Sequence, residues 1–451
     1  MVAAPPPARN ATLKQPGSPM THETVGPPST GGRIRALIWR HPLLALAVPA
    51  FIGLAIQAAL KKNVEWTDVY VAAARRLLDH GDIYLHGYLY PPFPALLAVP
   101  FTPLPDRLAS LAFFLVNFAC IVGLIRAAWE LATGRSIDRS DSSDWRQIAV
   151  FALGLSYSGT FVLNALAHQQ TDCIIAFLVM AGCLRCVRGG AVSGAILIGL
   201  AAAFKGPPLL FAAYFVFRRH WIAAALVVVT AVGVNLVPDL ISRSPREPLW
   251  LLDWLRNTVL PSQQLNAPVG QWGTALIFNQ SLGASLRRVL ETLAPAAPLA
   301  PQTVKLMAYG ILAAMLGATI AAAQYGRRLP SPQRADLPGR TAIEFAVVML
   351  LMLLMSPMSG IAHFGPTVLA AFCLAQLALF GGSRMSAALL AIAIALALPA
   401  NKDLVGATVY NVVLWNGFVT LSAVVLWIAC LIALARREPA HEARDRQLQA
   451  R

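Results

Sequence analysis

The sequence is poor in charged residues and in cysteine, and both shortages exclude classes of protein. Only 13% of its 451 residues are charged, whereas 57% are hydrophobic, and soluble domains carry about 25% charged residues. The six cysteines lie in or beside apolar runs, where a thiol packs as a small core residue. The chain is therefore neither an ordinary soluble protein nor a domain held together by a disulfide framework.

Motifs for metal or nucleotide binding are also missing. Cys183 and Cys186 have CxxC spacing, but neither a second such pair nor a nearby pair of histidines accompanies them. No glycine-rich phosphate loop follows a strand, and no paired acidic motif of the kind that holds a metal beside a nucleotide is present. These absences leave the sequence without a sign of a nucleotide-binding site. We expect no cofactor, and the sequence does not require a metal.

The chain is basic, with a formal net charge of +15, which at first sight suggests a nucleic-acid partner. However, the Lys and Arg residues sit in short loops between apolar runs rather than on one basic face. In membrane proteins such loops mark the cytoplasmic side. We therefore expect membrane lipids, and no nucleic acid, as partners.

Apolar runs of membrane length recur along the chain and predict an all-α, polytopic protein with about 10–12 transmembrane helices. Two of the runs, 190–204 and 207–217, are short, and Lys205-Gly-Pro-Pro208 separates them, so we expect a broken or re-entrant pair. The predicted spans lie near residues 41–60, 107–129, 147–167, 170–187, 190–204, 207–217, 221–239, 304–324, 341–358, 365–381, 385–399 and 407–434.

The distribution of basic residues predicts the topology. Residues 1–40 are rich in Pro, Ser and Gly and lack a small-residue cleavage site after an apolar core, which indicates a disordered cytoplasmic tail rather than a signal peptide. Residues 41–434 form the predicted transmembrane domain, and residues 435–451 a second cytoplasmic tail. The positive-inside rule places the loops 61–106 and 240–303 on the outer face.

The outer loops carry most of the polar chemistry. In the first, Asp68 starts a short amphipathic helix, and a tyrosine-rich stretch follows it. An ionisable group at the edge of a membrane is a candidate functional group, although Asp68 can equally serve as a cap for this helix. In the second, Trp250, Trp254 and Trp272 suit an interfacial helix at headgroup depth.

Five short motifs, taken in order, resemble the signatures of glycosyltransferase family 87. Each is weak alone, and their shared order carries the resemblance. The first is the outer loop with Asp68 and Tyr90-Pro-Pro92. The others are Asn164 with Gln170-Thr-Asp172, Lys205 with Pro208 after an apolar helix, Phe278-Asn-Gln-Ser281, and Ser356-Pro-Met-Ser359 with His363. The chain departs from the family pattern at Gln169, Asp172, Gly360 and Ala362.

The resemblance implies a C-type glycosyltransferase fold and a hexosyltransferase activity. Such an enzyme moves a sugar, often mannose, from a polyprenyl-phosphate donor to a glycolipid or glycan acceptor. It would be a multi-pass protein of the cell membrane with its active site on the outer face. Physical chemistry agrees, because a lipid-linked donor needs a cavity open to the bilayer, a wet region for its sugar and groups that stabilise the leaving phosphate.

The resemblance also assigns roles to residues. An inverting displacement needs a base for the acceptor hydroxyl, and Asp68 is the candidate, with Asp172 as a rival that can instead pair with Lys205. Lys205 and His363 are the candidates for binding the donor phosphate. The alternatives are that Lys205 extends its ammonium to the interface and that His363 only packs in a helix break.

A further group of residues is expected to bind the sugar or the acceptor. The tyrosines can form a sugar platform or can be interfacial anchors, and the residues of the 168–170 turn can simply cap a helix corner. The candidates are Tyr84, Tyr88, Tyr90, His168, Gln170, Asn279 and Gln280.

Two other functions remain open from the sequence. A transporter or flippase for lipid-linked saccharides also uses broken helices and intramembrane Lys, His and Asp, although we find no inverted repeat. An oligosaccharide ligase or polymerase has a similar membrane architecture and differs in transferring a lipid-linked chain instead of a single sugar.

Overall fold

A computed structural model describes residues 42–61, 64–137, 144–262, 273–296, 299–327 and 337–435. The predicted tails, residues 1–40 and 435–451, lie outside these residues apart from Ala435. The chain divides into two units, residues 1–54 and 55–451. Helix α2 (Pro42–Leu60) runs across the boundary between them, and every later helix belongs to the second unit. The described residues are mostly helical and form no strand.

Six stretches of the described chain are long and apolar enough to cross a membrane, and a bent pair of helices raises the number to seven. They are α5 (Asp106–Thr133), α6 (Trp145–Ala167), α10 (Trp221–Asn235) with η6 (Val237–Leu240), α14 (Pro301–Arg327), η8 (Ile361–Thr367) with α16 (Val368–Leu379), and α19 (Phe418–Ala435). The bent pair is α17 (Arg384–Ala397) with α18 (Lys402–Trp415), at 87°. The protein is therefore a multi-pass, all-α membrane protein.

This number is lower than the 10–12 expected from hydropathy, because several apolar helices are short. Helix α7 (Asp172–Val187) has 16 residues and α15 (Arg340–Leu354) has 15. The predicted break at Lys205 is confirmed, since α8 (Ala191–Phe204) ends there and η5 (Pro207–Leu209) leads into α9 (Leu210–Phe217).

The expectation of one span over 407–434 is wrong. Helices α18 and α19 are separate, and the chain turns between them at Gly417, whose φ is +66°. Glycine fits this conformation because it has no Cβ. A Cβ here would also lie 2.6 Å from the Cβ of Ser285, so α13 (Leu282–Leu293) packs closely against the turn.

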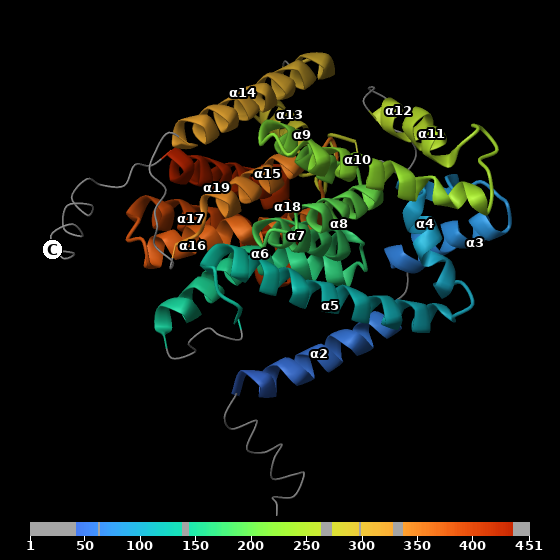
Figure 1. Cartoon of the computed structure of the whole chain (residues 1–451), viewed down its shortest axis with the longest axis horizontal. Coiled ribbons are helices and arrows are strands. Elements are labelled where there is room, and N and C mark those ends of the chain that lie inside the picture. Colours follow the sequence, from blue (N-terminus) through green and yellow to red (C-terminus); the bar gives the residue numbers. More distant parts are fainter. Residues whose placement is uncertain are drawn as a thin grey trace, which may run out of the picture. The chain divides into compact units, whose positions relative to one another are not determined.

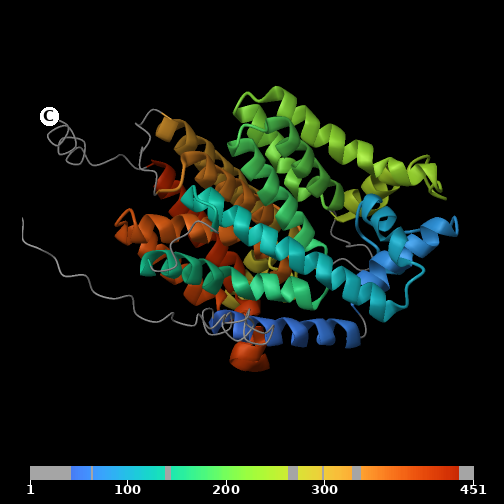
Figure 2. The same ribbon diagram turned by 60° about the horizontal axis from the view of Figure 1, so that its bottom comes forward.

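The loops 61–106 and 240–303, which are predicted to lie on the outer face and are called the outer loops below, contact each other. In Figure 1, α3 (Ala72–Leu78) and α4 (Phe93–Ala98) of the first loop lie next to α11 (Trp250–Trp254) of the second. Figure 2 shows the same neighbourhood from another side. Tyr84 donates a hydrogen bond to the carbonyl of Trp250, and the indole of Trp254 donates to the carbonyl of Leu89. These contacts join two segments far apart in the sequence.

The expected interfacial role does not hold for Trp250. Its side chain is fully buried, and its indole N–H donates to the carbonyl of Ser242 at 2.7 Å. The side chain of Trp250 therefore packs inside the protein and does not face lipid headgroups. Trp272 lies outside the described residues.

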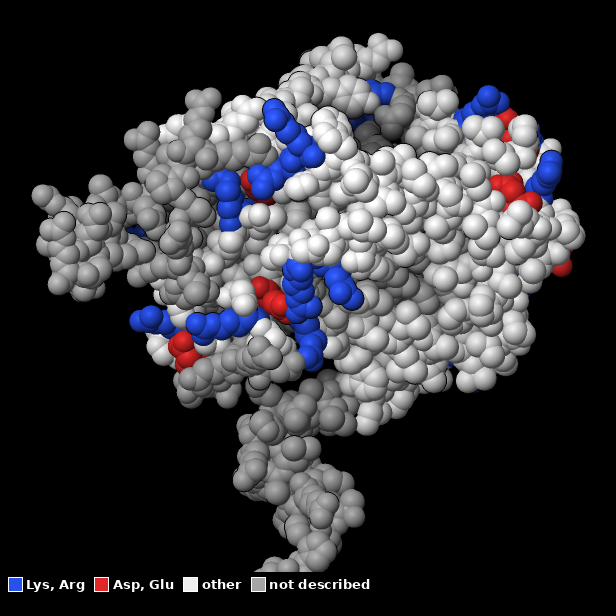
Figure 3. Space-filling model, viewed as in Figure 1, with Lys and Arg blue, Asp and Glu red and all other residues white. Residues whose placement is uncertain are grey.

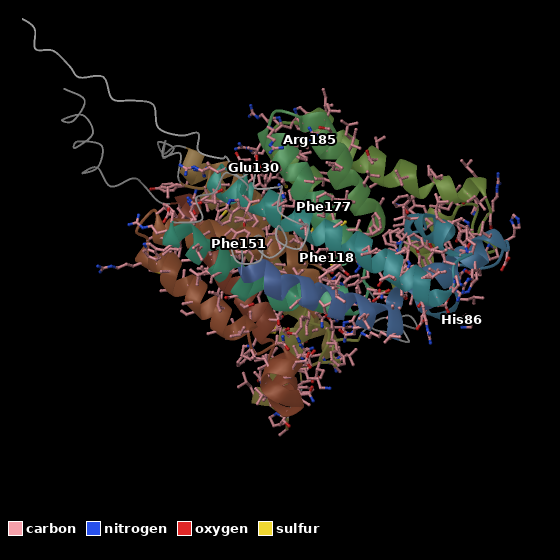
Figure 4. The ribbon with its side chains drawn as sticks, turned by 90° about the horizontal axis from the view of Figure 1, so that it is seen from below. His86, Phe118, Glu130, Phe151, Phe177 and Arg185 are labelled. Atoms are coloured by element: carbon pink, nitrogen blue, oxygen red, sulfur yellow. The ribbon has the colours of Figure 1, made fainter. Side chains whose placement is uncertain are left out.

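The charged side chains are unevenly distributed over the surface. On the face in Figure 3 they gather in the left part of the view and at its upper right edge, with a broad uncharged surface between them. Figure 4 shows His86 of the first loop at one end, Glu130 and Arg185 towards the other, and Phe118 and Phe177 between them. An apolar belt between two polar ends suits a membrane-spanning bundle.

Helices α7 and α8 approach each other closely through two glycines. A Cβ on Gly182 would lie 2.7 Å from the carbonyl oxygen of Gly194, and a Cβ on Gly194 would lie 2.6 Å from that of Gly182. Small residues at such positions let helix backbones pack tightly in membranes. The contact joins the end of α7 to the start of α8, whereas the start of α7 and the end of α8 lie at the other end of the pair.

We predict that Gly182→Ala destabilises the protein by about 1–3 kcal/mol, because the added methyl overpacks a contact that includes backbone atoms. Gly233→Ala in α10 is the matched control, since a Cβ there meets no atom within 4 Å. Thermal unfolding of the detergent-solubilised proteins, followed by tryptophan fluorescence, measures the difference. An unchanged melting temperature for Gly182→Ala would show that the helices separate without cost.

Candidate functional site

Lys205 is positioned by the break between α8 and η5. Its backbone is extended (φ −150°, ψ 138°), so the helix stops at Phe204. Pro207 and Pro208 follow, and proline has no N–H to donate to a continuing helix. The break therefore leaves the Lys205 side chain at a point where the ends of several helices meet.

Lys205 forms a compact polar cluster with Asp172 and His363. Its ammonium nitrogen lies 3.0 and 2.9 Å from the two carboxylate oxygens of Asp172 and 3.0 Å from Nε2 of His363. Nε2 of His363 lies 3.6 Å from the nearer Asp172 oxygen. The side chains are 16%, 7% and 15% exposed, in the order Lys205, Asp172, His363. The pairing of Asp172 with Lys205, an alternative that the sequence left open, is thus present.

His363 is held by its other ring nitrogen, since Nδ1 accepts a hydrogen bond from the backbone N–H of Gly360 at 3.0 Å. Its Nε2 lies 3.0 Å from the Lys205 ammonium and 3.6 Å from the Asp172 carboxylate, and the second distance is too long for a hydrogen bond. The Lys205 ammonium supplies the hydrogen bonds to Asp172. An ammonium and an imidazole side by side are suited to an anion with several acceptor oxygens.

The cluster lines a cavity of about 770 Å³. Most of the remaining wall is apolar and comes from the α14 and α15 helices, the residues after the α8 break and the second outer loop. The lining includes Tyr90, Ile175, Pro207, Pro208, Leu210, Trp254, Val304, Ala308, Leu312, Met352, Leu353, Leu354, Met355, Ser356 and Ser359. A polar region at one part of an apolar cavity is a common design of ligand sites.

Glu65 joins this site through two residues that the sequence had marked. Gln170 donates to one oxygen of its carboxylate at 2.7 Å, and the hydroxyl of Tyr90 donates to the other. Lys205 lies over the ring of Tyr90, 5.2 Å from its centroid. The sequence analysis did not identify Glu65. The one indication in the sequence was that Glu65 lies three residues before Asp68, in a loop that already contained candidate residues.

Tyr90 keeps its proton in this setting. Burial, together with the Glu65 carboxylate, raises the pKa of the Tyr90 phenol well above its ordinary value of 10.0. At neutral pH the hydroxyl is therefore a hydrogen-bond donor. It links the first outer loop to the cavity that it lines.

The structure does not bring Asp68 to this cluster. Its side chain is exposed, accepts a hydrogen bond from the hydroxyl of Thr67 at 3.2 Å, and does not line the cavity. It lies in the first turn of η1 (Trp66–Val71), a position that the helix dipole favours for an acidic residue. Its role as base stays a prediction.

Tyr84 and Tyr88 make contacts within and between the loops. The hydroxyl of Tyr88, which is 1% exposed, donates to the carbonyl of Pro91 at 2.7 Å and accepts from the N–H of Ala95. Tyr84 contacts Trp250. Neither tyrosine lines the cavity, so their predicted contact with a sugar gains no support from this geometry.

The turn at 168–170 is a helix corner with one unusual residue. His168 is exposed, and its Nδ1 lies 2.9 Å from the carbonyl oxygen of Asn164. Gln169 has a φ of +53° and is 1% exposed, and its amide donates to the carbonyl of Ala58. A left-handed conformation costs a non-glycine residue roughly 1–2 kcal/mol. Glycine adopts this conformation without that cost, so it would fit the position of Gln169 better than glutamine does.

Asn279 and Gln280 hold the loop before His363 in place. The backbone N–H of Gln280 donates to the carbonyl of Ser359 at 2.6 Å, and the amide of Asn279 donates to the carbonyl of Pro357. The Gln280 amide also donates to the carbonyl of Leu414 at 2.8 Å. Both side chains are almost fully buried. They therefore act on the cluster by positioning the loop that leads into η8.

Arg288 completes this arrangement from α13. Its guanidinium is buried and donates to backbone carbonyls of the loop before α13 and of the end of α18. Burial lowers the pKa of Arg288 to about 10, which still leaves it charged at neutral pH. The accepting carbonyls are those of Thr274, Leu276, Asn279, Leu414 and Trp415. Sequence reasoning also missed this residue, because an arginine in an amphipathic helix ordinarily faces water.

Within the described part of the chain, no group of three or more His, Cys, Asp or Glu side chains is arranged to hold a metal ion. The polar cluster has a single carboxylate, one ammonium and one imidazole. Such a set binds an anion more readily than a hard cation, which prefers several oxygen ligands.

Comparison with known proteins gives one family and two relatives. The model of glycosyltransferase family 87 matches residues 88–357. Both relatives are from Mycolicibacterium smegmatis. A polyprenol-phosphate-mannose-dependent alpha-(1-2)-phosphatidylinositol mannoside mannosyltransferase is 26% identical over 58% of this chain and 60% of its own length. A polyprenol-phosphate-mannose-dependent alpha-(1-2)-phosphatidylinositol pentamannoside mannosyltransferase is 24% identical over 47% of this chain and 53% of its own length.

The matches thus span about half to three fifths of the length of the curated relatives. No solved structure matches the chain. The residues matched by the family model include Tyr90, Asp172 and Lys205, whereas Asp68 and His363 lie outside them.

We predict that Arg288→Lys destabilises the protein by about 2 kcal/mol or more, since lysine cannot reach all of these carbonyls and each buried acceptor left unsatisfied costs about 1–3 kcal/mol. The neighbouring Arg287→Gln is the control, because the Arg287 side chain is 31% exposed. Equal melting temperatures for the two variants would contradict the stabilising role of the hydrogen bonds from Arg288 to the backbone carbonyls.

Proposed function

The chain belongs to glycosyltransferase family 87, and from this premise we propose that it transfers a sugar, preferably mannose, from a polyprenyl-phosphate donor to a glycolipid or glycan acceptor. The observation that carries the proposal is the Lys205–Asp172–His363 cluster in a largely apolar cavity. Both relatives are named as polyprenol-phosphate-mannose-dependent mannosyltransferases, which supports mannose on such a carrier as the donor.

The donor phosphate binds between Lys205 and His363 in this proposal. In the free protein both oxygens of the Asp172 carboxylate accept from the Lys205 ammonium, and Nε2 of His363 lies 3.6 Å from one of them. A phosphate oxygen offers the same negative charge and can replace the carboxylate on the Lys205 ammonium. The exchange keeps the Lys205 ammonium paired and leaves the buried Asp172 carboxylate without its partner, a cost that falls when the carboxylate takes up a proton.

The polyprenyl chain has an apolar path beside this polar region. The α14 helix forms part of the cavity wall, and among its described residues only Val304, Ala308, Met315 and Ala323 are buried. The rest of its apolar surface remains available to lipid. A carrier chain can therefore leave the cavity along α14 without crossing a polar layer.

The reaction follows from these positions. An acceptor hydroxyl attacks the anomeric carbon, and the bond between that carbon and the phosphate oxygen breaks. The electron pair stays on the departing polyprenyl phosphate, where Lys205 and His363 stabilise the growing charge. The proton of the hydroxyl passes to a carboxylate, and the sugar inverts at its anomeric carbon.

We place the base at Asp172 rather than at Asp68, the residue favoured by the sequence. Asp172 lines the cavity beside Lys205, whereas Asp68 is exposed and outside the lining. Transfer of Lys205 from Asp172 to the donor phosphate frees the carboxylate to accept a proton. Asp68 and Glu65 are the alternative candidates for the base, and the transfer rates of variants at the three positions distinguish them.

The proposed location is the cell membrane, with the cavity towards the outer face. The support is the bias of basic residues towards the opposite side, together with the two outer loops that contribute Tyr90, Trp254 and Arg287 to the cavity lining. A donor that carries its sugar on a membrane lipid is consistent with this placement.

We predict that Lys205→Gln or His363→Gln lowers sugar transfer on the order of 10²–10³-fold, because each variant removes a donor that stabilises the departing phosphate. The assay follows radiolabelled mannose from polyprenyl-phosphate mannose into membrane lipid extract, with purified protein in proteoliposomes. Lys402→Gln, at an exposed lysine, is the control. Carrier movement between leaflets without any transfer by the wild type would favour a flippase instead.

For the base, we predict that Asp172→Asn lowers the transfer rate by about 10²–10⁴-fold, whereas Asp68→Asn retains activity close to that of the wild type. Glu65→Gln should have a smaller effect than Asp172→Asn, because Glu65 reaches the cavity only through Tyr90 and Gln170. Melting temperatures confirm that each variant is folded. Loss of transfer in folded Asp68→Asn, with Asp172→Asn active, would return the base to Asp68.

A further inference from the structure

Two Pro-Pro pairs stand beside the cavity, and each leaves a backbone group without a partner in its own helix. In a continuing α8 helix the carbonyl of Ala203 would accept from the N–H of residue 207, but that residue is Pro207. Helix α4 begins at Phe93, directly after Pro91 and Pro92, and N–H groups in a first turn have no acceptor within the helix. Backbone groups of this kind need a partner from another part of the chain.

One side chain, that of Asn235 at the end of α10, bonds to both groups. Its Oδ1 accepts from the N–H of Phe93 at 2.9 Å, and its Nδ2 donates to the carbonyl of Ala203 at 3.2 Å. Nδ2 also donates to the carbonyl of Ala231, one turn earlier in α10, at 2.8 Å. Asn235 is 3% exposed. Its amide suits this position because it offers an acceptor and two donors in one plane.

The packing around Asn235 brings the same three helices together. The ring of Phe93 lies edge-on to that of Phe204, with centroids 5.3 Å apart, so α4 touches the last residue of α8. A Cβ on Gly199 would lie 2.8 Å from the carbonyl oxygen of Val227, so α8 and α10 approach each other closely before they reach Asn235. We call the meeting point of α4, α8 and α10 at Asn235 the Asn235 junction.

The Asn235 junction stands between two residues of the candidate site. Tyr90 precedes Phe93 by three residues, and Lys205 follows Ala203 by two. The Lys205 ammonium lies 5.2 Å from the centroid of the Tyr90 ring, within the range of a cation–π interaction. Because so few residues separate each of them from Asn235, a shift at the junction moves Lys205 relative to Tyr90.

We propose that Asn235 is a positioning residue of the donor site. It holds the Tyr90 loop against the end of α8 and so sets where the Lys205 ammonium stands in the cavity. The inference rests on the proposed function, which assigns Lys205 to the donor phosphate. Asn235 does not line the cavity, so it acts through Lys205 and not on the substrate. Such an effect is measurable, because a displacement of about 1 Å can cost on the order of 10²-fold in rate.

The test measures the binding of polyprenyl-phosphate mannose to the full-length protein in detergent by microscale thermophoresis. Asn235→Leu keeps the branched shape of the side chain but leaves the Phe93 N–H and the Ala203 carbonyl without their partner. We expect the affinity to fall roughly 2- to 30-fold, the range that substitutions without contact to a ligand produce. Wild-type affinity in folded Asn235→Leu would overturn the proposal.

A double-mutant cycle with Lys205→Gln separates positioning from a general loss of structure. If Asn235 acts through Lys205, Asn235→Leu weakens binding in the wild-type background and has no further effect once Lys205 is replaced. An equal loss of affinity in both backgrounds would show that Asn235 does not act through Lys205, and would overturn the proposal.

Gly182→Ala is the control for stability, because it overpacks the same α7–α8 pair at the end away from the site. It should lower the melting temperature and leave the affinity for polyprenyl-phosphate mannose unchanged. An equal loss of affinity in Gly182→Ala and Asn235→Leu, at equal melting temperatures, would overturn the proposal. Asn235→Ser, which can still donate to the Ala231 carbonyl, replaces Asn235→Leu in each comparison if the leucine variant does not fold.

Sugar transfer in proteoliposomes distinguishes this inference from the proposed function. If the wild type binds polyprenyl-phosphate mannose through Lys205 and Asn235 but transfers no mannose, the positioning role stands and the proposed function is overturned. If the wild type transfers mannose and folded Asn235→Leu binds and transfers equally well, the proposed function stands and the positioning role is overturned.

Discussion

The buried pair of Lys205 and Asp172 is the interaction on which the polar region depends. Taking an ammonium or a carboxylate out of water costs several kcal/mol per ion, and only good geometry with further hydrogen bonds offsets that cost. Here the ammonium reaches both carboxylate oxygens at about hydrogen-bond distance, 3.0 and 2.9 Å. The pair fixes the end of α8 to the start of α7, and His363 brings η8 to the same point.

A second layer of residues fixes this point without touching the reacting groups. Gln280 and Asn279 hold the Ser356–Ser359 loop, and Arg288 holds the loop that carries them against the end of α18. All of these bonds go to backbone carbonyls, which do not depend on the side chains at those positions. The geometry around His363 is therefore maintained by residues from three distant parts of the chain.

The cavity joins two kinds of surface that a reaction between membrane lipids requires. Its apolar walls allow hydrocarbon chains to remain in an environment like the bilayer, while its cationic groups offset the cost of bringing phosphate into that environment. The cationic side chains in its lining are Lys205, Arg287 and Lys305.

The sequence by itself determined the class of protein, the break at Lys205 and the order of the family motifs. These features are local, since apolar runs, prolines and short motifs act within a few residues of the chain.

Only the tertiary structure decided which polar groups meet. It joined Lys205 to His363, 158 residues away, brought Asp172 to the cavity while leaving Asp68 exposed, and added Glu65. It also divided the 407–434 run at Gly417, where α13 packs. The physical reason is that such contacts depend on how whole helices pack, and the packing of helices far apart in the sequence cannot be deduced from any one segment.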